Sequence, residues 1–254
     1  MIAAALALAL APCPDLPGVE ALWARPSRWI VAGESHGTAE APAAYAELVC
    51  HAGDQRPVVA AVEQLESDQP LIDAWIASDG GEAAKAALLE ARMWTTRDGR
   101  SSLAYLALFE RLRLLVREGR VRRVVAFQPA WTGPFDPARY EVMMAERLRA
   151  ASPDPSTRVV VLVGNVHAML REVNFGGTAY MPAAGLLPSG ETLTLNLMSN
   201  GGAAWNCTDE GCGAHDGAWQ PPQRVPRGIV LGGDTPWSGT FYLGVRTTAS
   251  PPAL

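Results

Sequence analysis

The chain has 254 residues and a formal net charge of −5 at pH 7, with 48% hydrophobic and 19% charged residues. This composition excludes a disordered chain and supplies the core of one large globular domain. The longest basic patch, residues 117–123, is interrupted by Glu118 and Gly119. Because nucleic acid is bound by a concentrated cationic face, we expect no nucleic-acid partner.

The chain begins with an apolar run, residues 1–11, that is too short to span a bilayer as a helix. Such a run is typical of a secretory signal peptide, although no Lys or Arg precedes it here. We therefore expect residues 1–13 to be the signal peptide of a periplasmic or secreted protein with no stable membrane span. A buried N-terminal helix in a cytoplasmic protein is the alternative.

The four cysteines agree with export, because disulfides form in oxidising compartments. Cys207 and Cys212 flank a short loop that contains Gly211, and a local disulfide could close it. A zinc knuckle is the alternative for this pair, but it needs two further ligands, and only His215 and acidic residues lie nearby. We therefore expect a disulfide between Cys207 and Cys212.

Hydrophobic periodicity predicts, in chain order, a strand at 29–32, a helix at 38–51, a strand at 57–62, helices at 71–77, 82–93 and 103–116, a strand at 121–127, a helix at 136–151 and a strand at 159–163. The alternation of strands and helices predicts an α/β fold, with a mainly parallel (mixed) sheet flanked by helices on both faces.

Beyond residue 175 the sequence is rich in Gly, Pro and Trp and contains short apolar runs. These runs predict strands at 193–197, 228–231 and 241–245, joined by long loops, with irregular structure at 200–217. We expect residues 14–254 to form a single domain, with its core at about 28–175 and a β-rich, loop-rich extension at 176–254.

Polar side chains follow four of the predicted strands at the point where each strand ends. They are Glu34 with His36, Glu63, Gln128, and Asn165 with His167. Ligands of open parallel sheets bind beyond the carboxyl ends of the strands, so these side chains predict a site at that edge.

Two of the chain's four histidines, His36 and His167, lie at matching places in two strand-Gly-x-x-His segments. They could be paired catalytic imidazoles, metal ligands or buried structural histidines, and the repeated context favours a paired site. A neutral imidazole has a pKa near 6.5 and can take a proton from water or bind a transition metal.

Several other residues are candidates for the same site. Glu34 and Glu63 could orient a histidine or join it on a metal, although Glu34 could instead cap the following helix. Arg97 and Arg100, in a polar loop, could bind a carbonyl or carboxylate group. The segment around Ser35 also fits the G-x-S-x-G pattern of serine hydrolases, but only one strand precedes it, which is unusual for that fold.

The segments Val31–Thr38, Glu63 and Gly164–His167 together resemble the erythromycin esterase/ChaN-like group, which also includes Tiki and TraB proteins. The first motif has the Gly-Glu-x-His form of the ChaN branch, and the resemblance covers roughly residues 28–175. It implies an α/β fold in which both His motifs and Glu63 meet in one cleft. In this group the esterases are thought to activate water with a His of the first motif, Tiki members are metal-dependent proteases, and ChaN members bind haem.

We therefore expect a hydrolase of an ester or amide bond in a small-molecule or peptide substrate. His36 is the expected general base or metal ligand, Glu34 and Glu63 orient it or share the metal, and His167 completes the cluster. Arg100 or Arg97 is expected to stabilise the oxyanion. A divalent metal (Zn, Mn or Co) held by His36, His167, Glu34 and Glu63 and metal-free acid–base chemistry both remain open.

The alternative is an envelope protein that binds haem or metal in the same cleft without turnover. A degenerate scaffold without activity is a third hypothesis. The sequence determines neither the substrate nor the oligomeric state.

Overall fold

The computed structural model describes residues 11–175, 177–209, 211–217, 221 and 223–254. Residues 1–10 of the expected signal peptide lie outside this range. A seven-stranded sheet forms the centre of the molecule, and all neighbouring pairs are parallel except the pair at one edge. The strands in spatial order are β10 (Gly228–Leu231), β11 (Gly239–Tyr242), β7 (Thr192–Met198), β1 (Trp29–Glu34), β4 (Arg158–Gly164), β2 (Val58–Leu65) and β3 (Val121–Gln128).

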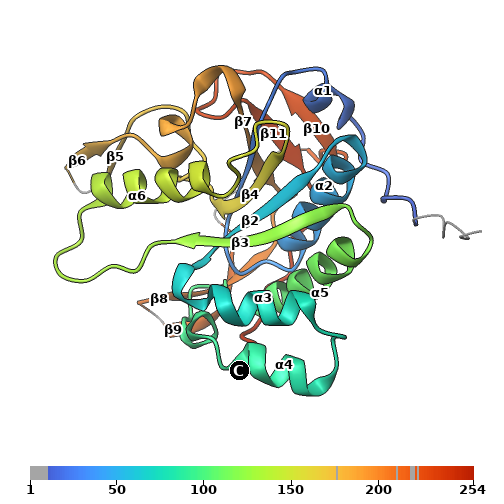
Figure 1. The fold of residues 1–254 in the computed structure, drawn as a ribbon. Helices are drawn as coiled ribbons and strands as arrows, with labels where there is room; N and C mark the ends of the chain where they lie inside the picture. The colour runs from blue at the N-terminus through green and yellow to red at the C-terminus, as the bar shows by residue number, and fades with distance from the viewer. Residues whose placement is uncertain (1–10, 176, 210, 218–220, 222) are drawn as a thin grey trace, which may run out of the picture.

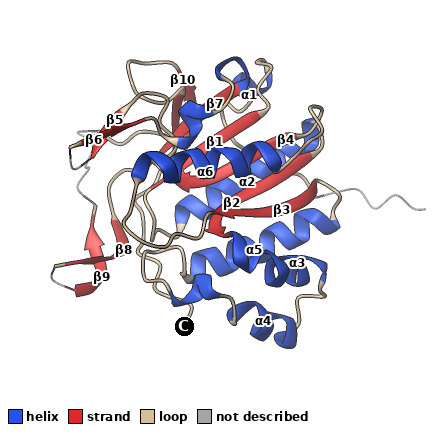
Figure 2. Ribbon diagram, turned by 60° about the vertical axis from the view of Figure 1, so that its left-hand side comes forward, coloured by secondary structure: helices blue, strands red, loops and turns tan. Residues whose placement is uncertain are grey.

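Helices cover both faces of this sheet (Figures 1 and 2). On one face lie α1 (Glu20–Trp23), α2 (Glu40–Gln55), α3 (Gln69–Ala77), α4 (Glu82–Leu89) and α5 (Leu103–Arg117), and on the other lies α6 (Pro137–Ala150). Short 3₁₀ helices connect them at Glu66–Asp68, Arg92–Thr95, Ala183–Leu186 and Ser189–Glu191. The predicted mixed, mainly parallel sheet with helices on both faces is confirmed.

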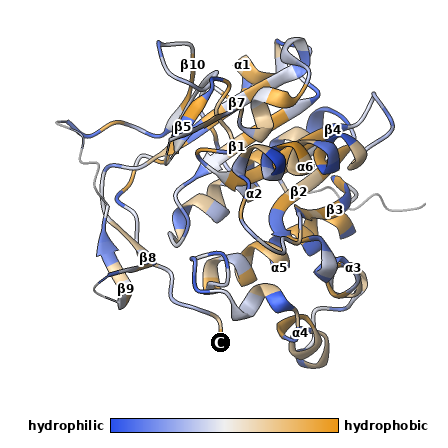
Figure 3. Cartoon of the chain, turned by 90° about the vertical axis from the view of Figure 1, so that its left-hand side faces the viewer, coloured by the Kyte–Doolittle hydropathy of each residue, from blue (hydrophilic) through white to orange (hydrophobic). Residues whose placement is uncertain are grey.

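The two apolar cores follow from the alternation of side chains along each strand. In β1, Ile30 and Ala32 face the core with α2 and α5, whereas Trp29 and Val31 face the core with α6. Figure 3 shows apolar residues concentrated along the central strands and on the helices that pack against them. Strands buried on both faces read as continuous apolar runs, and this is why the sequence predicted them correctly.

The part of the chain beyond residue 175 contributes three strands, β7, β10 and β11, to the main sheet. Two hairpins lie outside it: β5 (Val173–Phe175) with β6 (Thr178–Tyr180), and β8 (Ala203–Thr208) with β9 (Gly211–Asp216). The prediction of irregular structure at 200–217 is therefore wrong. The hairpin was missed because no residue of either strand is buried, and because β9 contains two glycines and is mostly exposed.

Several element boundaries also differ from the prediction; for example, the helix expected at 38–51 is α2, which ends at Gln55. The helix expected at 82–93 ends at Leu89, and the chain continues into a 3₁₀ helix. The strand expected at 241–245 is β11, which ends at Tyr242, shortly before Gly244 takes a positive φ of 76°. Such a backbone conformation is incompatible with an extended strand.

All four cysteines form disulfides, Cys13–Cys50 and Cys207–Cys212. The expected Cys207–Cys212 bridge is confirmed, and it closes the β8–β9 hairpin. Disulfides of this kind are typical of proteins that fold outside the cytoplasm. In the described part of the chain, no helix is both long enough and apolar enough to cross a membrane.

Candidate functional site

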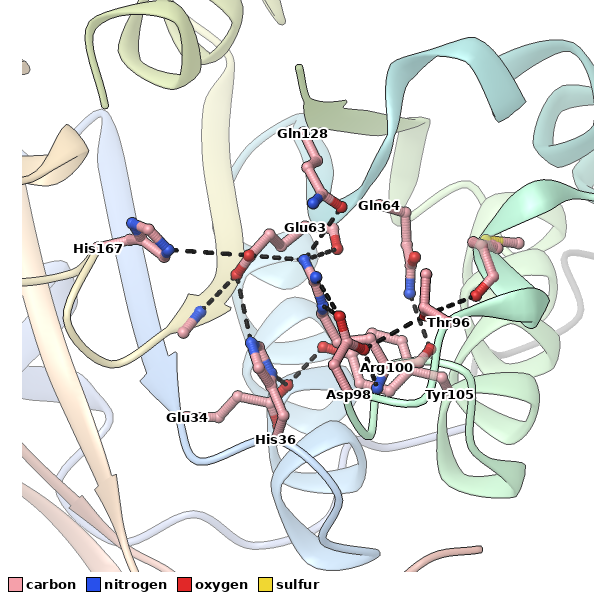
Figure 4. Close-up of polar contacts among 12 residues, drawn as sticks. Glu34, His36, Glu63, Gln64, Thr96, Asp98, Arg100, Tyr105, Gln128 and His167 are labelled. Carbon is pink, nitrogen blue, oxygen red and sulfur yellow. Dashed lines mark hydrogen bonds and ion pairs between the residues drawn. The ribbon is translucent and has the colours of Figure 1, made fainter. Parts of the chain in front are cut away.

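The two histidine motifs meet at the carboxyl edge of the sheet because their strands are neighbours. β1 and β4 pair in parallel, with Glu34 opposite Gly164. β2 pairs with the other side of β4 and brings Glu63 to the same edge. Figure 4 shows Glu63 between His36 and His167. Its carboxylate lies 3.6 Å from Nε2 of His36 and 3.9 Å from Nε2 of His167.

Glycines make this close approach possible. A Cβ on Gly33 would lie 2.9 Å from Cα of Asn165, so a side chain there would force the two motifs apart. A Cβ on Gly164 would lie 3.2 Å from Nε2 of His36 and 3.3 Å from Cδ2 of His167. Because Gly164 has no side chain, both imidazoles can pack against the backbone at the end of β4.

His36, in the turn that follows β1, is held by the buried carboxylate at the end of that strand. Its Nδ1 donates a hydrogen bond to Oε1 of Glu34 at 2.9 Å, which leaves Nε2 turned toward Glu63. The hydroxyl of Tyr105, from α5, donates to the same oxygen of Glu34. Glu34 is 1% exposed, and its other oxygen has no hydrogen-bond partner among the described residues. These bonds fix the ring and its tautomer, and they give Glu34 an orienting role rather than a helix-capping one.

His167 is also oriented by a buried carboxylate, which comes from α6 on the face of the sheet opposite α2 and α5. Its Nδ1 donates to Oε1 of Glu141 on α6 at 2.6 Å. The second oxygen of Glu141 accepts from the backbone N–H of Ala183 at 2.7 Å. The site thus contains two carboxylate-oriented imidazoles, each with its Nε2 directed at one central carboxylate.

The central carboxylate, Glu63, is fixed by a charged partner. Arg100 donates to Oε1 of Glu63 at 2.6 Å, and the backbone N–H of Gly164 donates to Oε2 at 2.6 Å. Arg100 also bonds Asp98, and its Nη1 lies 3.0 Å from the side-chain oxygen of Gln128. Glu63 is 3% exposed and Arg100 is 9% exposed, so the pair is removed from bulk water.

The charges in the cluster shift the titration of its members. Burial by itself would lower the pKa of His36, but the hydrogen bond to Glu34 and the charge of Glu63 outweigh it and raise that pKa above 6.5. The pKa of His167 is raised in the same way, by Glu141 and Glu63 against burial. Burial would raise the pKa of Glu63, but Arg100 and the two histidines keep it below its ordinary value.

The structure brings together five residues that the sequence singled out, namely Glu34, His36, Glu63, Arg100 and His167. It does not bring Arg97 or Ser35 into this cluster, and both residues are exposed. No hydrogen bond joins Ser35 to a histidine within the described ranges, so the arrangement of a serine hydrolase is not formed around it.

Sequence reasoning missed Glu141, Tyr105 and Asp98. Tyr105 is part of the leucine- and aromatic-rich run of α5, which predicted only core packing. Glu141 lies on the buried stripe of α6 that includes Met144 and Leu148. Burying a carboxylate on an apolar stripe costs free energy unless the carboxylate is paired. The position of Glu141 on that stripe was therefore the sequence signal that it has a buried partner.

We tested whether the expected ligands His36, His167, Glu34 and Glu63 fit a shared metal ion. Both Nδ1 atoms are bonded to carboxylates, which leaves the two Nε2 atoms available, whereas both oxygens of Glu63 accept hydrogen bonds from Arg100 and Gly164. Among the residues that the structure describes, no three His, Cys, Asp or Glu side chains are grouped so that they could hold a metal ion. A bound metal therefore stays a prediction, and we derive no step through one.

Comparisons with known proteins support the fold. No protein-family model and no curated protein matches the sequence. Among solved structures, the chain is similar to a succinoglycan biosynthesis protein, with a TM-score of 0.66, 10% identity and 89% of each chain covered. It is also similar to a mutant of the erythromycin esterase EreC in its open conformation, with a TM-score of 0.55, 11% identity, and 89% of this chain and 76% of the esterase covered.

A third similar structure is described as bacterial protein toxins, with a TM-score of 0.46 and 16% identity over 68% of this chain. The chain spans only 34% of that toxin's length, and this likeness carries no argument. The similarity to the erythromycin esterase described above confirms the expected resemblance at the level of the fold.

Proposed function

We propose that the protein is a hydrolase that activates water for attack on an ester or amide bond, in an exported setting that the two disulfides support. The observation that carries the proposal is the pair of imidazoles, each bonded through Nδ1 to a buried carboxylate and each directing Nε2 at the same third carboxylate, that of Glu63. A histidine oriented in this way is the usual general acid or base of hydrolytic enzymes.

His36 is the general base in this proposal. Glu34 accepts a hydrogen bond from its Nδ1–H, which leaves the lone pair of Nε2 free to take a proton from water. His167, whose pKa is also raised, carries a proton on Nε2 and delivers it to the leaving group. The water proton taken by His36 balances the one released by His167, so no net proton is lost during the step.

Glu63 and Arg100 act as positioning residues. The negative charge of Glu63 favours the protonated form of the neighbouring imidazole, and the ion pair with Arg100 keeps this carboxylate ionised. The guanidinium N–H groups of Arg100 are occupied by Glu63, Asp98 and Gln128. We therefore assign Arg100 to the support of Glu63 in place of the oxyanion role expected from the sequence.

The proposal is tested by screening aryl esters and aryl amides with the wild-type protein and with the His36→Ala and His167→Ala variants. Removal of a general base or acid lowers the rate by about 10²- to 10⁴-fold, so both variants are expected to lose activity on that scale. His51 lies on α2, and its side chain bonds the backbone oxygen of Pro14, away from the site, which makes His51→Ala the matched control with unchanged activity. Full activity in either site variant would contradict the assignment.

Metal and haem analysis of the same proteins separates hydrolysis from binding. Stoichiometric Zn, Mn or Co in the wild type that is lost from either variant would assign the cluster to a metal. A Soret band after haem addition that is lost in His36→Ala, without turnover of any ester or amide, would assign it to haem binding.

A further inference from the structure

Three arginines gather at the edge of the sheet opposite the histidine pair. Arg28 directly precedes β1, Arg56 closes the C-terminus of α2 just before β2, and Arg158 begins β4. Because β2, β4 and β1 are adjacent and parallel, their amino ends lie side by side. Arg56 and Arg158 both donate to the backbone oxygen of Ser27 at 3.3 Å, and Arg28 donates to the backbone oxygen of Ser152.

None of the three guanidinium groups forms an ion pair with a carboxylate in the described part of the chain. Asp154 and Glu191 act on Arg56 only through space, and the oxygens of Asp154 are taken by Ser156, Thr157 and Arg122. Arg158 lies 4.6 Å from the ring of Trp23 and Arg28 lies 4.5 Å from that of Trp29. Aromatic faces attract a cation but do not neutralise it.

Several donors in this cluster have no acceptor. Four buried nitrogen atoms have no hydrogen-bond partner among the described residues. They are Nε of Arg28, Nε of Arg56, Nη1 of Arg158 and the indole nitrogen of Trp29. Arg158 is 4% exposed, so its charge is almost fully removed from water. An unpaired buried charge is strongly destabilising. Burial, and to a smaller extent the charge of Arg56, lowers the pKa of Arg158 to about 10.

We propose that Arg28, Arg56 and Arg158 form a binding site for a tetrahedral oxyanion, either free phosphate or the phosphoryl group of a small molecule. Such an anion supplies the negative charge that the cluster lacks, and its several oxygens match the planar N–H forks of guanidinium groups. The whole length of β1 separates this cluster from the histidine pair, which corresponds to roughly 20 Å for a strand of this size. The anion is therefore distinct from the hydrolysed substrate, and the proposal does not depend on the proposed hydrolase activity.

The test is isothermal titration calorimetry with sodium phosphate, sodium sulfate and glycerol 3-phosphate, at an ionic strength held constant with sodium chloride. We expect saturable binding of one anion per chain. Binding is expected to be at least about 10-fold weaker in Arg56→Gln, because a charged hydrogen bond contributes about 1.5–3 kcal/mol. Arg92 is exposed on a 3₁₀ helix elsewhere, so Arg92→Gln is the matched control with unchanged affinity.

The two sources of the anion are distinguished in the same experiment. Tighter binding of glycerol 3-phosphate than of phosphate would identify a phosphorylated small molecule, and the reverse order would identify the free anion. The absence of saturable binding of all three anions to the wild type would overturn the proposal, as would equal affinity in the wild type and Arg56→Gln.

A thermal melt without added anion separates an anion site from a purely structural cluster. Arg56→Gln relieves like-charge repulsion, so its anion-free form is expected to melt at the same temperature as the wild type or higher. Phosphate is expected to raise the melting temperature of the wild type and not that of the variant. A lower melting temperature in the anion-free variant, together with no effect of phosphate on the wild type, would make the arginines structural and overturn the proposal.

Discussion

Three glutamates of the site have different tasks because their partners differ. Glu34 and Glu141 accept hydrogen bonds from the Nδ1 atoms of the histidines, whereas Glu63 is bonded to Arg100 and faces the two Nε2 atoms. A carboxylate bonded to an imidazole N–H favours the protonated ring, and so does the charge of Glu63. Both imidazoles are therefore poised to titrate above the ordinary histidine value.

The first prediction at this scale concerns the pH dependence of hydrolysis. His36 must be neutral to accept a proton, and its pKa is raised, so activity is expected to increase with pH to a midpoint above 6.5. Activity is expected to fall again at higher pH as His167 loses its proton, which gives a bell-shaped profile of kcat/KM. The two midpoints belong to the coupled pair rather than to either residue alone.

Substitution of the orienting carboxylate should shift that profile. Glu34→Gln removes the hydrogen bond and the charge that raise the pKa of His36 and leaves burial, which lowers it. The low-pH midpoint of kcat/KM is therefore expected to move down, and the maximum to fall by about 10- to 100-fold. Glu82 is exposed at the start of α4, and Glu82→Gln should leave the profile unchanged. An unshifted midpoint in Glu34→Gln would argue against its role.

At the scale of elements, the site is built where strand ends and helices meet. β1, β2 and β4 deliver His36, Glu63 and the turn that carries His167. The helices supply the supporting groups from opposite faces of the sheet, Tyr105 from α5 and Glu141 from α6. Rigid elements hold such a cluster more accurately than loops do.

The end of β4 offers a direct test of this geometry. Gly164→Ala places a methyl group 3.2 Å from Nε2 of His36 and 3.3 Å from Cδ2 of His167, so the imidazoles must move apart. Misplacement of catalytic groups by a fraction of an ångström is expected to lower kcat/KM by about 10- to 100-fold. Gly190 has no atom within 4 Å of its virtual Cβ, which makes Gly190→Ala the control with normal activity. Wild-type activity of Gly164→Ala would show that the close contact is not needed.

At the scale of the whole molecule, the chain is tied together by strands and disulfides from distant segments. β7 and β11, from the last third of the sequence, pair beside β1 and extend the sheet. The Cys13–Cys50 bridge fastens the N-terminal segment to α2, whereas Cys207–Cys212 closes only a local hairpin. Because Cys13 forms a disulfide with Cys50, the signal peptide of an exported form would have to be cleaved before Cys13.

The two disulfides should contribute unequally to stability. The Cys13–Cys50 bridge spans 37 positions and Cys207–Cys212 spans 5, and a longer loop loses more entropy in the unfolded chain. The pair Cys13→Ala and Cys50→Ala is expected to lower the free energy of unfolding by about 4 kcal/mol, and Cys207→Ala with Cys212→Ala by about 2 kcal/mol. Urea denaturation measures both values. An equal loss of unfolding free energy in the two double variants would contradict the expected effect of loop length.

The sequence by itself determined much of the fold and the larger part of the residues in the site. Buried parallel strands are continuous apolar runs, so β1, β2, β4 and the second half of β3 were visible without a structure. The polar residues that end those runs placed His36, Glu63 and His167 at one edge. These features are local, because a strand and the residues that follow it are adjacent in the chain.

Only the tertiary structure decided which groups support the histidines. Glu141 is 26 positions from His167, and Tyr105 is 71 positions from Glu34. Periodicity tells which face of a helix is buried but not what that face meets, because the meeting depends on how α5 and α6 pack on the sheet. The unneutralised arginine cluster likewise appears only when three strand starts, far apart in the sequence, lie side by side.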